Sequence, residues 1–285
     1  MVRLQPFNGL NIFGTGADGS GPNAGTLTGS AYNYTDWDFT GIITLNPTGT
    51  GTTIRVLGNF SMSGAGALIQ CYPEVTGAAD WGAATDGVAG GAGGDATGVT
   101  LSRITTMEEQ LWTTYRQAGY GYGPTGKGYG NRRFTLLVGG TVNIDTTVAD
   151  RIDFNGTGSA TASSGGGGGG LICIISGTGI TVTGTNFAVK AQGYKGRDGA
   201  AAAYGGGGGG GGAIILMAPT ITGITLGASY VAGGVGGSST FAGGGNAGGG
   251  GGSFGAGGAG GSVAHPAGYN GSAGQTYSLL IPPIL

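Results

Sequence analysis

The chain has 285 residues, and 73 of them are glycine, about a quarter of the sequence where an ordinary protein has about 7%. Charged residues make up 8% and the net charge is −2, which argues against a nucleic-acid partner, because phosphate binding requires clustered Lys and Arg. Disordered chains are poor in apolar residues and rich in charge, whereas this chain is 39% hydrophobic. The composition therefore favours a rigid, stacked architecture.

The N-terminal sequence MVRLQPFNGLNIFG has neither the apolar segment nor the cleavage site of a signal peptide. No run approaches 18 apolar residues, so we expect no membrane insertion. Such a protein can still reach the outside of a cell by assembly into a virion and release by lysis. Cys71 and Cys173 are too few for a disulfide framework or a zinc site. We expect buried thiols, with a single disulfide as the alternative.

Residues 1–75 are predicted to form an N-terminal β region. The stretch Ala31–Leu45 alternates like strands separated by a turn, and further strands are predicted at Thr53–Val56, Asn59–Met62 and Ala67–Cys71.

Residues 76–133 form an insertion that contains the one predicted helix. Thr105 is a candidate N-cap, Glu108 completes a capping box, and Gly119 fits the C-terminal stop. The sequence YGYGPTGKGYGNRR that follows is predicted to be loop.

Residues 134–285 are predicted to be a glycine-rich repeat domain. Two units related by a shift of 41 to 42 residues each have a glycine run followed by three short strands. The matched strands are Leu171–Ile175 with Ala213–Met217, Ile180–Thr183 with Ile221–Leu226, and Phe187–Ala191 with Ser229–Ala232. A degraded copy begins at Arg133, and the strands of residues 53–71 are a candidate earlier copy.

The glycine tracts Gly165–Gly170, Gly205–Gly212 and Gly233–Gly261 allow two interpretations. They could be flexible linkers, but ordering them between apolar strands would cost entropy without gain. They could instead be packed helices of the polyproline II type, which have three residues per turn and no internal hydrogen bonds. We favour the packed form, because glycine lets neighbouring backbones satisfy one another.

The predicted fold is therefore all-β, with stacked short strands like those of a β-helix or solenoid. Packed polyglycine II segments and one small helical insertion complete it. No single unit could bury its own apolar face, so stacking of neighbours would create the core.

The tracts at 165–170, 205–212 and 248–252, with connectors such as AGGVGG and GGAGG, resemble the receptor-binding adhesins at the tail-fibre tips of T-even-like phages. The phrase GGGGAIILMAPTITG is similar to those of glycine-rich β-helical virion proteins. The resemblance covers about residues 150–276. It implies a sandwich of polyglycine helices whose connecting loops contact a bacterial receptor.

Catalytic motifs are weak. His265 has no acid or nucleophile near it in sequence, which disfavours a Ser-His-Asp system. Gly126-Lys127-Gly128 lacks the hydroxyl residue and the helix of a phosphate-binding loop. Paired carboxylates could serve glycoside hydrolysis, but the candidates fall in no recognisable motif: Asp36, Asp38, Asp145, Asp150 and Asp153. We expect no enzyme, no cofactor and no metal site.

Aromatic and basic residues on loops are the binding candidates, since Tyr and Arg are typical of recognition surfaces. The first cluster is Tyr120, Tyr122 and Tyr129 with Lys127, Arg132 and Arg133; the second is Tyr194, Lys195, Arg197, Asp198 and Tyr204. Phe241, Phe254 and Tyr269 punctuate the last glycine-rich region. Alternatively, these aromatics cap glycine layers or pack between subunits.

We expect a structural or adhesive protein of a virion surface, at a tail-fibre tip or in a fibre. Its partners would be other virion proteins or copies of itself, and its loops would bind a host glycan or an outer-membrane protein. The apolar C-terminal sequence YSLLIPPIL is expected to dock on a neighbouring strand or a partner subunit. A purely structural fibre or capsid-decoration subunit is the main alternative, and a polysaccharide-degrading spike is less favoured.

Overall fold

The computed structural model describes residues 12–46, 51–71, 130–148, 151–158, 162–184, 188–199, 203–240, 250, 254–262 and 265–282. Within these ranges the regular structure is mostly strand, and the helical turns are two short 3₁₀ helices, η2 (Thr146–Val148) and η3 (Ala228–Val231). This confirms the all-β prediction at the level of class. The predicted helix at 105–119 lies outside the described residues.

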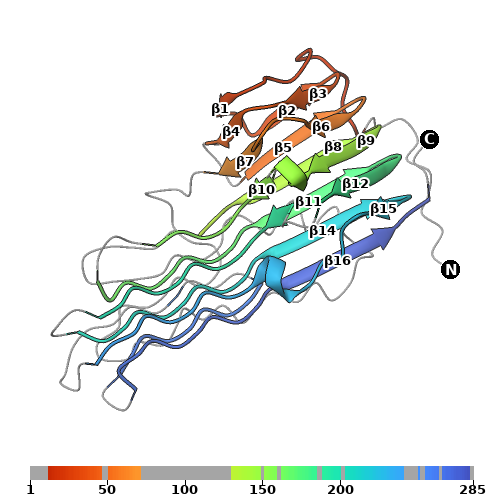
Figure 1. Ribbon diagram of the computed structural model, residues 1–285. Coiled ribbons are helices and arrows are strands. Elements are labelled where there is room, and N and C mark those ends of the chain that lie inside the picture. The colour runs from red at the N-terminus through yellow and green to blue at the C-terminus, as the bar shows by residue number, and fades with distance from the viewer. Residues whose placement is uncertain are drawn as a thin grey trace.

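The strands form three sheets in which every paired strand is parallel to its neighbour (Figure 1). Sheet A has the order β1 (Gly25–Leu27), β4 (Ile42–Leu45), β7 (Leu68–Cys71), β10 (Arg151–Asp153) and β13 (Val189–Lys190). Sheet B has the order β16 (Gln275–Leu280), β14 (Ala213–Ala218), β11 (Leu171–Ser176), β8 (Arg133–Val138), β5 (Gly51–Val56) and β2 (Ala31–Tyr34). Sheet C has the order β15 (Ile221–Thr222), β12 (Gly179–Thr183), β9 (Thr141–Asp145), β6 (Phe60–Met62) and β3 (Trp37–Phe39).

The sequence repeat is visible in the strand register. Leu171 lies opposite Ala213, and Ile180 lies opposite Ile221, so the 41- and 42-residue shifts place matched strands side by side. The degraded copy occupies the adjacent position, with Leu171 also opposite Arg133. Gly51 in turn pairs with Arg133 across the long insertion. Each repeat therefore adds one strand to sheet B and one to sheet C.

Two predicted strands are corrected. The segment predicted as Ile221–Leu226 is a strand for two residues only, because Gly223 adopts a φ of +76° and turns the chain out of the extended conformation. The segment predicted as the strand Ser229–Ala232 is instead part of η3, which Tyr230 closes by donating its N–H to the carbonyl of Gly227. The carbonyl of Tyr230 still accepts a hydrogen bond from Ala191, which follows β13.

The main core lies between the three sheets. Alternate residues of each strand point inward, as the two-residue period of a strand requires. Large side chains with no exposed surface fill it, among them Trp37, Phe39, Phe60, Phe134, Phe154, Ile174 and Ile214. Trp37 is near the centre of an aromatic group and donates its Nε1–H to the carbonyl of Pro22 at 2.8 Å.

The outer face of sheet B is covered as well. All six residues of β8 and of β11 are buried, as is typical of strands that are enclosed on both faces. A second apolar cluster on this face includes Leu171, Cys173 and Ile215, and Phe13 and Phe254 belong to it. Residues from far apart in the chain therefore close over the middle of sheet B.

Candidate functional site

The glycine-rich segments run side by side away from the ends of the strands (Figure 1). We call this part the glycine bundle, and its described segments are 154–158, 162–170, 191–199, 203–212, 231–240, 254–262 and 265–274. It is the candidate functional site, because it carries the described members of the second predicted binding cluster.

The tract 205–212 is surrounded by other glycine-rich segments and donates its hydrogen bonds to them with a period of three. Gly205, Gly208 and Gly211 donate to the carbonyls of Pro266, Tyr269 and Ser272 at 2.9 Å. Gly206, Gly209 and Gly212 donate to Arg197, Tyr194 and Ala191, whose segment runs in the opposite direction, at 2.7 to 2.9 Å. None of these bonds lies within the tract itself, as in a polyproline II helix.

The carbonyl groups of the same tract accept from three further segments. Those of Gly205, Gly208 and Gly211 accept from Gly261, Gly258 and Gly255, and those of Gly206 and Gly209 accept from Gly237 and Gly234. The carbonyls of Gly207 and Gly210 accept from Gly166 and Gly169. Five segments thus contact the tract by hydrogen bonds, which pair most of its backbone polar groups although it is buried.

Close approach explains why this tract is glycine throughout. A Cβ atom added at any position from Gly205 to Gly212 would lie 1.8 to 2.1 Å from a backbone oxygen of a neighbouring segment. Such a distance is far inside van der Waals contact, so any side chain would force two backbones apart. The sequence of the tract is therefore a consequence of its position at the centre of the bundle.

The segment 191–199 has fewer neighbours, and glycine is needed only at every third position. Gly193, Gly196 and Gly199 donate to the carbonyls of Ala232, Val235 and Ser238. The positions between them carry larger residues, which include Tyr194, Lys195, Arg197 and Asp198. Peripheral segments can therefore display side chains that the central tract cannot.

The second predicted binding cluster is divided by the structure. Tyr194 is 36% exposed and covers Gly158, where an added Cβ would lie 2.3 Å from the tyrosine Cε1. Lys195 is exposed and Arg197 is half-buried. Tyr204, in contrast, is completely buried, with its Cβ facing Gly261. Tyr204 therefore packs inside the bundle, in line with the alternative interpretation that these aromatic residues pack against glycine layers.

Asp198 links two peripheral segments. Its Oδ1 accepts hydrogen bonds from the backbone N–H and from the hydroxyl of Ser238, both at 2.9 Å. These donors hold the pKa of Asp198 below its usual range, and the nearby charges of Lys195 and Arg197 act in the same direction. The carboxylate is therefore a structural acceptor at the surface of the bundle.

Two residues of the first predicted binding cluster, Arg132 and Arg133, lie within the described part of the chain. Tyr120, Tyr122, Tyr129 and Lys127 lie outside the described residues. Arg132 and Arg133 were expected on a loop, but Arg133 begins β8, and the two are 2% and 9% exposed. Burial lowers the pKa of Arg133, while the neighbouring Cys173 thiol acts in the opposite direction. These two arginines are not surface residues.

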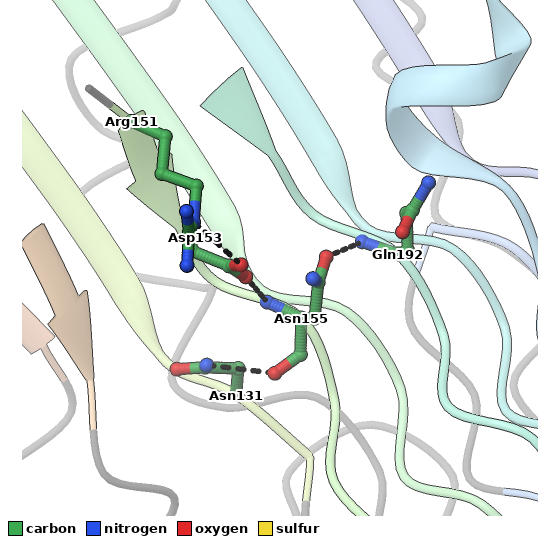
Figure 2. A network of polar contacts seen from close by, with 5 residues as sticks. All are labelled: Asn131, Arg151, Asp153, Asn155 and Gln192. Carbon is green, nitrogen blue, oxygen red and sulfur yellow. Dashed lines mark hydrogen bonds and ion pairs between the residues drawn. The ribbon is translucent and has the colours of Figure 1, made fainter. Parts of the chain in front are cut away.

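A polar network fixes the point where strands pass into the glycine bundle (Figure 2). Asn155 lies at its centre: its Oδ1 accepts from the N–H of Gln192 at 2.7 Å, and its carbonyl accepts from Nδ2 of Asn131 at 2.9 Å. Asp153 accepts from the N–H of Asn155 at 3.2 Å and pairs with Arg151 at 3.8 Å. Sequence reasoning missed this network, for which the spacing Asp-x-Asn after a strand was the available signal.

The carboxylates proposed for glycoside hydrolysis serve as structural acceptors. Asp36 accepts from the N–H of Asn59 at 2.8 Å, and Asp38 accepts from the hydroxyl groups of Ser61 and Ser63. Asp145 accepts from Thr147, which lowers its pKa. Asp150 lies outside the described residues.

His265 and the cysteines show no arrangement for chemistry in the described residues. His265 stacks on Tyr269 with ring centroids 4.4 Å apart, and its Nδ1 lies 2.6 Å from the carbonyl of Ala267. Cys71 and Cys173 are buried and do not form a disulfide, which confirms the prediction. Burial raises the pKa of each thiol to about 12. No group of three His, Cys, Asp or Glu residues with metal-binding geometry occurs in the described ranges.

None of the helical segments that the structure describes is long and apolar enough to cross a membrane. Comparison of the chain with protein-family models, with curated proteins and with solved structures gave no match.

Proposed function

We propose that the chain is a structural and adhesive protein of a virion surface, at a tail-fibre tip or within a fibre. The supporting observation is the three-residue hydrogen-bond period around Gly205–Gly212, which makes a stiff element with almost no charge. The resemblance of the chain's sequence to the glycine-rich tip adhesins of T-even-like phages supports the same role.

The proposal includes a specific architecture. The three sheets are the sides of successive coils of a β-helix, and the glycine bundle is a packed array of polyglycine II helices. The in-register parallel pairing of β8, β11 and β14 supports the first part. The period-three donors of the central tract support the second.

The mechanism is rigid display. Loops at the ends of well-packed elements lose little conformational entropy on binding, so a stiff scaffold raises affinity without added contacts. Tyr194 and Lys195 are exposed on a peripheral segment and combine an aromatic surface with a positive charge. That combination suits a host glycan or an outer-membrane protein, in a role that involves no catalysis.

Binding to cells tests this role. Purified, fluorescently labelled protein should bind saturably to a subset of a bacterial strain panel. The Tyr194→Ala/Lys195→Ala double variant should bind at least about tenfold more weakly, as removal of a hot-spot pair does. The matched control is Val235→Ala, on a neighbouring segment and 63% exposed. Equal loss in both variants, or saturable binding to no strain, would contradict an adhesive role.

The burial of Tyr204 favours a second candidate, a purely structural fibre or decoration subunit whose aromatics pack within the scaffold. Labelling of intact particles with antibody against this chain separates the two functions. An adhesin should be labelled at fibre tips, whereas a decoration subunit should be labelled over the capsid. Release of oligosaccharides from host capsule would instead indicate the polysaccharide-degrading spike.

A further inference from the structure

Among the described residues, β16 leaves one edge of sheet B open. Gln275 and Ile281 donate their N–H groups to Gly212 and Ala218, at 3.0 and 3.1 Å, on the side of β14. Because successive residues of a strand alternate in direction, the backbone groups of Thr276, Ser278 and Leu280 face away from β14. β16 is the terminal strand of its sheet in the part of the chain that the structure describes, and no described residue pairs with these groups.

The core is also incompletely closed at this end. We call it the C-terminal end, made of β15, residues 223–227, η3 and β16. Ile224, Leu226 and Tyr230 pack against the core but are only partly buried. Leu280 is 73% exposed, the highest value among the large hydrophobic residues that are exposed in the described ranges. Apolar surface and an open strand edge therefore occur together.

From Gln275 to Leu280 this edge has no charged residue, proline or bulge, and the first prolines are Pro282 and Pro283 beyond the strand. Natural edge strands are guarded by charged residues, proline or bulges. β16 pairs with β14 in unbroken register from Gln275 to Leu280. From Gly199 to Leu285 the sequence contains no Lys, Arg, Asp or Glu. An uncharged edge of this kind matches another uncharged strand.

At the opposite end of the strand stack, the chain itself covers β2 and the residues just before β3. Asp18 donates its N–H to Asn33, which lies in β2, and the carbonyl of Gly19 accepts from Thr35. Gly21 donates to the carbonyl of Asp36, just before β3. A second copy stacked head to tail would thus meet an edge of sheet B that is already occupied. Contact between two C-terminal ends is the remaining self-complementary arrangement.

We propose that the C-terminal end binds a second copy of this chain about a two-fold axis, with β16 antiparallel to its counterpart and Ser278 opposite Ser278. A two-fold interface is closed, so it gives a dimer and no filament. The pairing extends sheet B across both copies and covers Leu280, Leu226 and Tyr230. The two glycine bundles of the dimer then point in opposite directions. The dimer proposal does not depend on the proposed adhesive function.

Light scattering over a concentration series tests the dimer. The wild-type protein should have twice the chain mass of 27.4 kDa. Leu280→Lys adds a charge to the edge, and Ser278→Pro removes an outward N–H group; each should weaken dimerisation at least about tenfold. Ile42→Lys is the matched control, since Ile42 is 50% exposed in β4. Unchanged thermal unfolding of one of the two edge variants shows that its fold is intact.

Oxidation of Ser278→Cys adds a geometric test. Two cysteines facing each other across the axis fall within the Cα separation of about 4.4 to 6.8 Å that a disulfide requires. A covalent dimer is expected, and Cys71 and Cys173 are buried and should not contribute. A monomer at every concentration, open-ended growth, or a dimer that neither edge variant weakens would overturn the proposal.

Discussion

At the scale of single residues, the short distance to neighbouring backbones explains why the central tract, Gly205–Gly212, contains only glycine. Gly209 is representative: an added Cβ would lie 2.1 Å from the carbonyl oxygen of Gly167. The neighbour is backbone, which cannot move aside by changing a rotamer. Gly227, in contrast, has no atom within 4 Å of an added Cβ, and its φ of −142° is open to any residue.

Gly209→Ala should therefore destabilise the protein by about 3 kcal/mol or more, at or above the upper end of the usual cost of overpacking. Gly227→Ala should change stability by less than about 1 kcal/mol. Urea denaturation followed by circular dichroism measures both. Equal stability of the two variants would mean that the tract is not closely packed.

The buried thiols give a second prediction at this scale. At pH 8 a thiol reagent should label neither cysteine in the native protein, since burial holds the pKa of both at about 12, and should label both in denaturant. The unfolded chain ionises its thiols near about pH 8.5, so the folded state binds more protons above that pH. Stability should therefore fall as the pH rises from about 8.5 towards 12. Rapid labelling of the native protein would contradict the burial.

At the scale of elements, the network around Asn155 connects the end of β10 with the segment after β13. Its Oδ1 accepts the N–H of Gln192, near the start of the peripheral segment 191–199. Loss of the acceptor leaves this N–H without its partner, at a cost of about 1 to 3 kcal/mol.

Asn155→Ala should show this loss in urea denaturation, and Asn155→Asp, which keeps the acceptor oxygen, should recover most of it. An alanine variant as stable as the wild type would show that the junction is held by the glycine bundle alone.

The sequence predicts most strands because their apolar residues repeat at matched positions. β11, β12 and β14 lie where Ile, Val and Leu recur after glycine runs, within a residue or so of the expected bounds. η3 was not predictable, because Ser229–Ala232 has the composition of a strand and its 3₁₀ turn depends on the local bond between Tyr230 and Gly227.

For the candidate site, the exposure of Tyr194 and Lys195 follows from their places between glycines spaced by three. The burial of Tyr204, Arg132 and Arg133 does not follow from their local sequence. It depends on segments that are distant in the chain, which composition and periodicity do not reveal. Domain boundaries at residues 75 and 133 stay predictions.

At the scale of the whole molecule, sheets and glycine bundle form one continuous hydrogen-bonded system. Gly170 is the last residue of its glycine tract, and Leu171 is the first residue of β11. The backbone of each forms a hydrogen bond with a neighbouring segment. The same holds where Gly212 meets β14. We therefore expect the glycine bundle to be as stiff as the strands from which its segments continue, as the proposed rigid display requires.

Amide hydrogen exchange, resolved residue by residue, tests the ordered glycine tract most directly. Gly205, Gly206, Gly208, Gly209, Gly211 and Gly212 all donate to neighbouring segments, so their amides should exchange as slowly as those of β11 and β14. Exchange of these six amides at the rate of an unstructured chain would contradict the account, because the tract would then be a solvated linker.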